Sequence, residues 1–146
     1  MADTFRCRLV TPDAELLSDE VSYASVPAWD GLIGFQPGRA PIVGRLGMGE
    51  LRLDFPAAKG SGSRHFFVDQ GFLKMGDGEL TILAEKAVPA ERIVEQDARA
   101  ELAAAEARTI PADTPDRVAA QDRLAHEKNA ARTKLRLAQA VKGKGI

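Results

Sequence analysis

The hydrophobic pattern of this chain changes near residue 88, and this change limits its possible folds more than any other feature. Before that point apolar and polar residues alternate, as in Phe5, Cys7 and Leu9 with arginines between them. An alternation with a period of two predicts a strand with one buried face. After residue 88 glycine is absent until Gly143, and alanine becomes the most frequent residue. The sequence therefore predicts a β domain followed by a helical one.

The first part, residues 1–87, contains several short alternating runs, including Leu51 to Phe55 and Leu80 to Ile82. Turn-forming residues separate them at positions 11–13, 59–62 and 76–78. Such turns join neighbouring strands as hairpins. Because no helical pattern lies between the strands, we expect an antiparallel β-sandwich.

The second part, residues 88–146, predicts a two-helix hairpin. Residues 91–108 consist almost entirely of good helix formers. Pro89 is expected at an early helical position and Glu91 near the positive end of the helix dipole. The stretch TIPADTP then interrupts the helix. A second helix is expected from Thr114 as N-cap, with Pro115 at its first position, to about Val141.

The apolar seam of the second helix consists mostly of alanine. Its members recur at helical spacing: Ala120, Leu124, Ala131, Leu135 and Ala138. Because an alanine buries little apolar surface, such a seam holds a partner weakly. The pattern fits an arm that detaches and docks elsewhere, and it equally fits helices that stay packed.

Positive charge gathers at the end of the chain. From His126 onward six Lys or Arg residues accompany a single acid, Glu127. Lys128, Arg132 and Arg136 follow each other at intervals of four and so share one helical face. Such a stripe is typical either of a solvated face or of a helix that seeks an acidic protein surface. The absence of interleaved aromatic residues argues against nucleic acid, and the lack of a bulky apolar face argues against membrane insertion.

No residue pattern predicts catalysis or metal binding. The glycines after residue 31 lack the Gly-Lys-Ser/Thr ending of a phosphate-binding loop, and the third glycine of the dinucleotide motif is missing. His65 and His126 lie in different segments without Cys or acid at ligand spacing. Cys7, the single cysteine, occupies an alternating strand position and is expected to be a core residue. The formal net charge of −1 excludes an overall basic nucleic-acid binder.

The glycine-rich stretch of residues 31–51 reads Gly-x-x-Gly-x-x-Pro-Gly-Arg-Ala-Pro, then Leu-x-x-Gly-x-Leu. It resembles the signature G-x-x-G-x-x-P-G-H-A-P-L of the epsilon subunit of F-type ATP synthases, which is called delta in mitochondria. Further landmarks follow in the family's order: residues 9–12 (LVTP), 67–72 (FVDQGF) and 80–85 (LTILAE). The resemblance covers the β domain end to end, and the helical hairpin follows where the family has one.

The resemblance implies a mechanical role without an active site, cofactor or metal. The subunit would belong to the central stalk, where it contacts the gamma subunit and the c-ring and couples ion translocation to ATP synthesis. Its membrane association would be indirect, through the complex, at the cytoplasmic face of a bacterial inner membrane.

The resemblance also assigns residues. The docking residues for the c-ring and gamma are Asp30, Gly31, Gly34, Pro37, Gly38, Arg39, Ala40 and Pro41. Three positions depart from the family pattern. Arg39 stands where histidine is usual, Leu32 where many relatives have an acid, and Gln70 where the family has the first of two glycines.

In related bacterial proteins the helical hairpin restrains ATP hydrolysis, because its basic last helix meets an acidic loop of the beta subunit. The residues here that match this role are Lys128, Arg132, Lys134 and Arg136. Some relatives bind ATP through a motif I/L-D-x-x-R-A. Arg99 and Ala100 match its end, but Glu95 and Gln96 stand where the apolar residue and the aspartate belong. The incomplete motif argues against ATP binding and leaves Arg99 as its candidate residue.

Two other classes of function remain open on the residues alone. One is a stand-alone β-domain protein, whether a binding module or an enzyme that uses its glycine-rich end as a pocket. The other is an adaptor with a basic helical arm.

Overall fold

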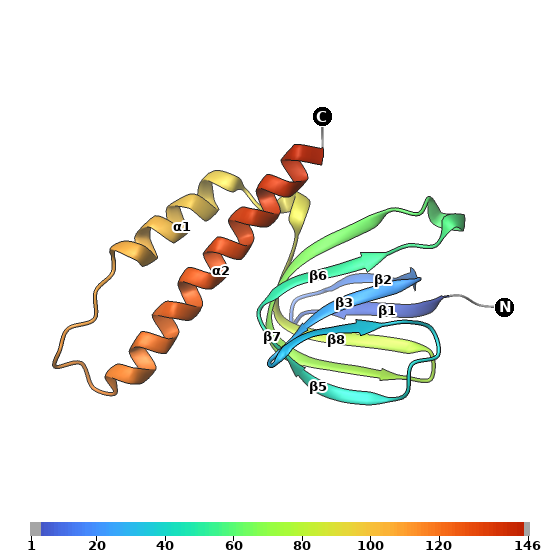
Figure 1. The fold of residues 1–146 in the computed structure, drawn as a ribbon, viewed down its shortest axis with the longest axis horizontal. Helices are drawn as coiled ribbons and strands as arrows, with labels where there is room; N and C mark the ends of the chain where they lie inside the picture. Colours follow the sequence, from blue (N-terminus) through green and yellow to red (C-terminus); the bar gives the residue numbers. More distant parts are fainter. Residues whose placement is uncertain (1–3, 145–146) are drawn as a thin grey trace. The chain divides into compact units, whose positions relative to one another are not determined.

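A computed structural model describes residues 4–144, with side chains to residue 141. It divides into two compact units, Met1–Pro89 and Ala90–Ile146. The described strands lie in the first unit and the described α-helices in the second (Figure 1). The predicted fold class, a β-sandwich followed by a helical hairpin, is therefore confirmed.

Eight strands form the first unit, and all belong to one sheet that folds over on itself. They are β1 (Phe5–Val10), β2 (Glu15–Val21), β3 (Tyr23–Ala28), β4 (Gly31–Phe35), β5 (Ile42–Leu46), β6 (Gly49–Asp54), β7 (Ser63–Gly76) and β8 (Glu79–Pro89). A single 3-10 turn, η1 (Ala57–Lys59), lies between β6 and β7. The strand order is β2-β1-β8-β7-β5-β3-β4, and β6 pairs with β3 and β7.

The predicted hairpins at residues 11–13, 59–62 and 76–78 are confirmed. They connect β1 to β2, β6 to β7 and β7 to β8, and each pair is antiparallel. The first and last strands, β1 and β8, also pair with each other, in parallel. The turn pattern does not predict this pair, because its strands lie far apart in the chain.

The long strand β7 connects the two layers of the sandwich. Its first half pairs with β6 and its second half with β5, while β8 follows it on the other side. The bend falls at Gln70 and Gly71, whose φ angles are +58° and +136°. A Cβ on Gly71 would lie 1.9 Å from the carbonyl oxygen of Leu83. Only glycine fits at this close approach of two backbones.

The sandwich has a core of its own, made of the inward residues of its strands. Phe5, Cys7 and Leu9 of β1 are buried, as their alternation predicts, and Leu51 and Leu53 of β6 meet them there. Burial raises the pKa of the Cys7 thiol to about 12. The thiol is therefore a small core group that stays protonated at neutral pH, as expected.

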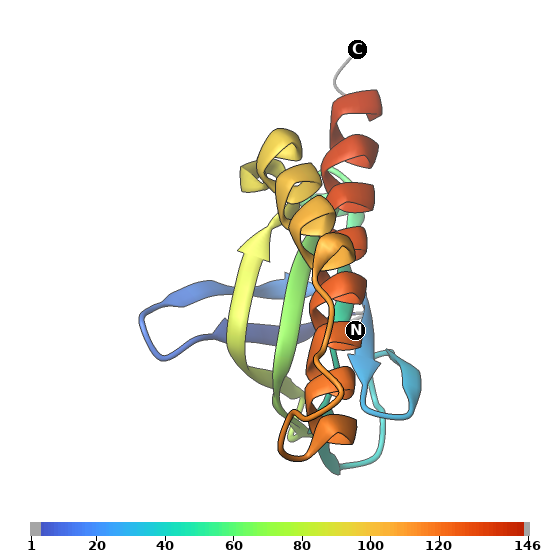
Figure 2. The same cartoon turned by 90° about the vertical axis from the view of Figure 1, so that its left-hand side faces the viewer.

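The second unit consists of a 3-10 turn, η2 (Ala90–Arg92), and two helices, α1 (Glu95–Ala107) and α2 (Arg117–Lys144). The two helices lie side by side as a hairpin (Figure 2). None of the described helices has the length and apolar character needed to span a bilayer.

The predicted start of the first helix is wrong by four residues. Pro89 is the last residue of β8 rather than an early helical residue, and Glu91 lies in η2. Val94, at the N-cap of α1, has an extended backbone with φ −84° and ψ 116°. Ile93 and Val94 are both β-branched, which favours such a conformation. Glu95 and Asp97 therefore occupy the first helical turn.

The predicted cap of the second helix is also wrong. The hydroxyl of Thr114 donates to the carbonyl oxygen of Pro111 at 2.7 Å, and Pro115 precedes the helix. Asp116 is the N-cap, because its carboxylate accepts from the N–H of Ala119 at 3.3 Å. The short side chain of an aspartate also tolerates the φ of +47° at this position.

The predicted seam of α2 is partly buried. Ala131 and Ala138 are buried, whereas Ala120, Leu124 and Leu135 are half-buried. Leu137, which the seam did not include, is buried as well. Lys142 and Lys144, two of the six basic residues that follow His126, have side chains outside the described residues.

Candidate functional site

The loop between β4 and β5, residues 36–41, is fastened by Arg39. The guanidinium Nη1 donates to the carbonyl oxygen of Gly34 at 3.0 Å, and the guanidinium carbon Cζ lies over the Phe35 ring, 5.1 Å from its centre. The backbone N–H of Arg39 donates to the backbone carbonyl oxygen of Gln36 at 3.3 Å. Gly38 has a φ of +83°, which permits this tight turn without strain. The loop is thus a shaped surface that its own residues hold in place.

A pocket of about 440 Å³ opens beside this loop. Its lining comprises Tyr23, Gly34 and residues 36–39. A Cβ on Gly34 would lie 2.5 Å from the Tyr23 hydroxyl, so glycine leaves room here for the tyrosine. Four of the predicted docking residues, Gly34, Pro37, Gly38 and Arg39, therefore come together at one pocket.

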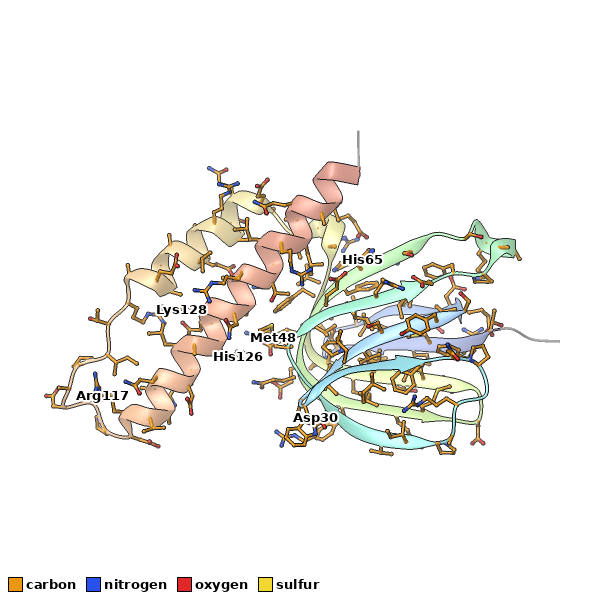
Figure 3. All side chains as sticks on the ribbon, viewed as in Figure 1. Asp30, Met48, His65, Arg117, His126 and Lys128 are labelled. Carbon is orange, nitrogen blue, oxygen red and sulfur yellow. The ribbon has the colours of Figure 1, made fainter. Side chains whose placement is uncertain are left out.

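The structure separates the remaining docking residues into two places. Ala40 and Pro41 are exposed and lead from the loop into β5. Asp30 lies in the turn between β3 and β4, and Gly31 begins β4 (Figure 3). The length of β4, about 17 Å for five residues, separates this turn from the loop. The eight residues therefore form two surface regions rather than one.

Exposed apolar side chains connect these regions across the outer face of the sheet. Phe72 of β7 pairs with Arg45 on one side and with Leu83 on the other. The backbone N–H of Trp29 donates to the backbone carbonyl oxygen of Arg45 at 3.1 Å, so Trp29 lies beside Arg45 at the Asp30 turn. We call this surface the apolar face; its large exposed members are Trp29 (68% exposed), Leu32 (72%), Val43 (72%), Phe72 (58%) and Leu83 (50%).

The apolar face was missed in the sequence. Leu83 follows the inward Ile82 directly, so an apolar residue stands where the alternation requires a polar one. The same holds for Phe72 beside Leu73. Apolar residues at consecutive strand positions were the sequence signal that could have predicted this exposed apolar face. Several large apolar side chains exposed on one face of a sheet indicate a surface for protein contact.

In the hairpin, the basic residues of α2 face acids on α1. Lys134 Nζ lies 3.2 Å from Glu101 Oε2, and Arg132 Nη2 lies 3.8 Å from Glu106 Oε2. Arg136 also has an interaction partner. The ammonium group of Lys128 forms no hydrogen bond or ion pair with any residue that the structure describes. These exposed pairs contribute little free energy each, about 0.2–1 kcal/mol, and can exchange for other partners.

Arg99, the candidate for ATP binding, lies on α1 and donates to Glu95 Oε1 at 2.8 Å. Its side chain is 61% exposed. It lines neither of the two pockets described for this chain. ATP binding through Arg99 stays a prediction without further support.

The geometry defines a class of protein: a small β-sandwich that presents a fastened loop and an apolar face, followed by a helical hairpin with a basic helix. His65 lies on β7, as expected, with its Nδ1 2.5 Å from Glu50 Oε2. Within residues 4–141 no three His, Cys, Asp or Glu side chains converge as a metal site.

Comparison with known proteins specifies this class. Residues 4–90 match the family model described as ATP synthase, Delta/Epsilon chain, beta-sandwich domain. The ATP synthase epsilon chain of Rhodopirellula baltica is 37% identical over 82% of this chain and 88% of its own length. That of Solibacter usitatus is 38% identical over 70% of this chain and 73% of its own. The chain belongs to the ATP synthase delta/epsilon chain family.

Two solved structures share the fold. A chain of the Euglena gracilis mitochondrial ATP synthase, in a structure of OSCP, F1 and the c-ring, has a TM-score of 0.67 and 19% identity, with 100% of this chain and 84% of that one covered. A chain from the central stalk and c-ring of the Tetrahymena thermophila enzyme has a TM-score of 0.62 and 16% identity, with 91% and 95% covered. The likeness extends to the helical hairpin, which the family model does not cover.

Proposed function

We propose that this chain is a non-catalytic subunit of the ATP synthase central stalk, which couples ion flow through the c-ring to ATP synthesis. The observation that carries the proposal is the family match over the whole sandwich. The neighbours in solved structures come from ATP synthase assemblies that include the c-ring. The chain would stay at the cytoplasmic face of a bacterial inner membrane through its partners.

The apolar face would bind the gamma subunit, and the fastened loop would bind the c-ring. A row of large apolar side chains suits a flat protein surface such as gamma, because its burial supplies most of the binding free energy. The loop offers glycine, proline and the backbone-bonded Arg39, which suit the polar loops of a c-ring. The Asp30 turn adjoins the apolar face and would extend it.

The docking is tested by co-purification of the tagged chain with gamma and the c-ring from membranes. Phe72→Glu combined with Leu83→Glu places two charges on the apolar face, and we expect gamma to be lost. The control is Arg64→Glu with Lys86→Glu, which changes the charge by twice as much at two exposed or half-exposed sites of β7 and β8 outside the face. If gamma still co-purifies with the Phe72→Glu/Leu83→Glu variant, this docking mode is contradicted.

The hairpin would restrain ATP hydrolysis through Lys128, Arg132, Lys134 and Arg136. Lys134 and Arg132 already bind acids of α1, so an acidic loop of the beta subunit would replace one set of carboxylates with another. We expect truncation after Pro89 to raise the hydrolysis rate of the assembled enzyme. The cut leaves β8 and the sandwich core complete. An unchanged hydrolysis rate in an enzyme that still assembles would refute the inhibitory role.

A further inference from the structure

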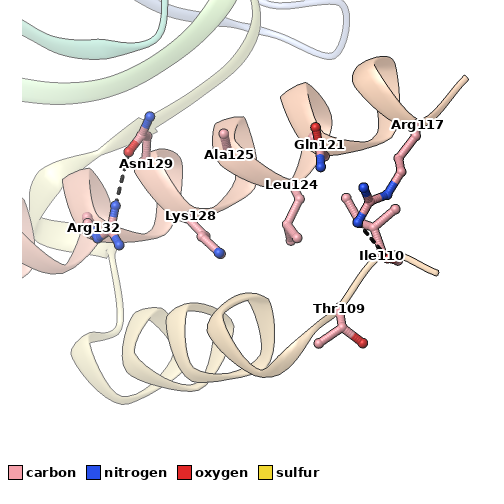
Figure 4. A pocket seen from close by; sticks show the side chains of 9 residues that line it. All are labelled: Thr109, Ile110, Arg117, Gln121, Leu124, Ala125, Lys128, Asn129 and Arg132. Carbon is pink, nitrogen blue, oxygen red and sulfur yellow. Dashed lines mark hydrogen bonds between the residues drawn. The ribbon is translucent and has the colours of Figure 1, made fainter. Parts of the chain in front are cut away.

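A second pocket, of about 450 Å³, lies within the helical unit between α2 and the segment that follows α1 (Figure 4). Thr109 and Ile110 form one wall, and one face of α2 from Arg117 to Arg132 forms the other. The volume is in the range of about 300–1,000 Å³ that small-molecule sites occupy. The docking residues of the sandwich and Arg99 take no part in it.

The lining of the pocket is positively charged. Three cations line it, Arg117, Lys128 and Arg132, and none of the described lining residues is acidic. The ammonium group of the half-buried Lys128 has no hydrogen bond or ion pair with any described residue. Arg132 Nη2 forms an exposed ion pair with Glu106 Oε2 at 3.8 Å, and its Nη1 donates to Asn129 Oδ1 at 3.2 Å (Figure 4), so a ligand there competes only with weak partners. Arg117 Nη2 donates to the carbonyl oxygen of Ile110 at 3.4 Å, which leaves its other N–H groups available.

The cations stand at both ends of the pocket, with apolar groups between them. Arg117 and Lys128 are eleven residues apart, or about 16 Å along the helix axis. Leu124 lies between them and points toward the segment that carries Ile110 (Figure 4). Arg132, one turn beyond Lys128, strengthens the second end. A ligand with a single charged end would leave one of these ends without a partner.

We propose that this pocket binds a small organic dianion, with an acidic group at each end and an apolar middle. Arg117 binds one acidic group, and Lys128 with Arg132 binds the other. Leu124 and Ile110 contact the apolar middle, which distinguishes an organic ligand from an inorganic ion. The site does not depend on the stalk function proposed above, because it lies within the hairpin of a single chain.

The test uses the purified full-length chain and two eight-carbon probes that differ in one charge, octanedioate and octanoate. Isothermal calorimetry gives the affinity, and methyl NMR of Ile110 and Leu124 gives the location, with Leu73 of the sandwich core as the reference signal. We expect octanedioate to bind about tenfold more tightly than octanoate, as one charge-assisted contact implies. Sulfate at the same ionic strength is expected to leave the two methyl groups unshifted.

Variants distinguish this site from general attraction to a basic helix. Arg117→Gln, and Lys128→Gln combined with Arg132→Gln, should each reduce octanedioate affinity to about that of octanoate, and Lys128→Gln alone should reduce it in part. Arg123→Gln removes a charge from the same helix outside the pocket and should change nothing. Leu124→Ala should weaken both probes alike, and circular dichroism checks that each variant keeps its helices. Equal affinity for the two probes, or equal losses in the Arg123 and Lys128 variants, would overturn the proposal.

Discussion

Gln70 adopts a backbone conformation that costs free energy. Its φ of +58° lies in the left-handed region, where a residue with a side chain is disfavoured by about 1–2 kcal/mol. The family pattern has glycine at this position. The hydrogen bond from its backbone N–H to Gly47 at 3.3 Å does not need the side chain. A single residue thus shows why the family uses glycine at the bend of β7.

We therefore expect Gln70→Gly to stabilise the sandwich by about 0.5–1 kcal/mol, the relieved strain less the greater flexibility of glycine in the unfolded chain. Urea unfolding at equilibrium measures the change. Glu85→Gly, on the opposite strand without a left-handed φ, is the control and should destabilise. A loss of stability in Gln70→Gly as large as that of the control would contradict the strain argument.

The thiol of Cys7 is expected to resist alkylation in the folded chain. Its pKa of about 12 results from burial, so at pH 8 almost no thiolate forms and reagents have no access. The unfolded thiol, with a pKa near 9.0, is far more reactive. Iodoacetamide labelling at pH 8, followed by mass spectrometry with and without urea, measures the difference. Rapid labelling of the folded chain would show that β1 opens readily.

At the scale of secondary-structure elements, the start of α2 depends on Asp116. We expect Asp116→Ala to destabilise the helical unit by about 1 kcal/mol, because the cap to Ala119 is lost and alanine tolerates the left-handed φ less well. Asp116→Asn keeps both properties and should be nearly neutral. Circular dichroism and thermal unfolding compare the two. Thr114 is the cap that the sequence predicted, and Thr114→Ala should destabilise the helical unit less than Asp116→Ala does. The reverse order would identify Thr114 as the cap.

Local patterns predicted the elements well where neighbours in sequence are also neighbours in space. Alternation located β1, β6 and β8, and the turn residues located three hairpins. The parallel pairing of β1 with β8 has no local signal, because about 70 residues separate the paired strands. The predicted start of α1 was wrong for another reason. Good helix formers begin at Glu91, but the β-branched Ile93 and Val94 favour an extended backbone and delay the helix.

At the scale of the whole molecule, the sequence motifs identified the loop but not the surface around it. Glycines and prolines at fixed spacing pointed to this loop as a docking region, and the contacts of Arg39 show how the loop is held in place. The motif could not show that β4 places Asp30 far from Pro41, because spacing along a chain does not give direction in space. The apolar face joins the turn after β3 with residues of β4, β5, β7 and β8, so it became visible only once the strand order was known.

The last prediction concerns charge on the hairpin in the assembled enzyme. Replacing Lys128, Arg132, Lys134 and Arg136 together by glutamine removes four cations, and the ion pairs Arg132–Glu106 and Lys134–Glu101 that it breaks contribute little free energy. We expect the variant to fold and assemble, and to release hydrolysis by about fivefold, the lower end of typical coupling between sites. Arg123→Gln, a cation of the same helix without a proposed role, should leave the rate unchanged. Truncation removes every contact of the hairpin, whereas this variant removes charge alone. If truncation raises the hydrolysis rate and the glutamine variant does not, the restraint depends on the shape of the hairpin, and the proposed electrostatic contact is excluded.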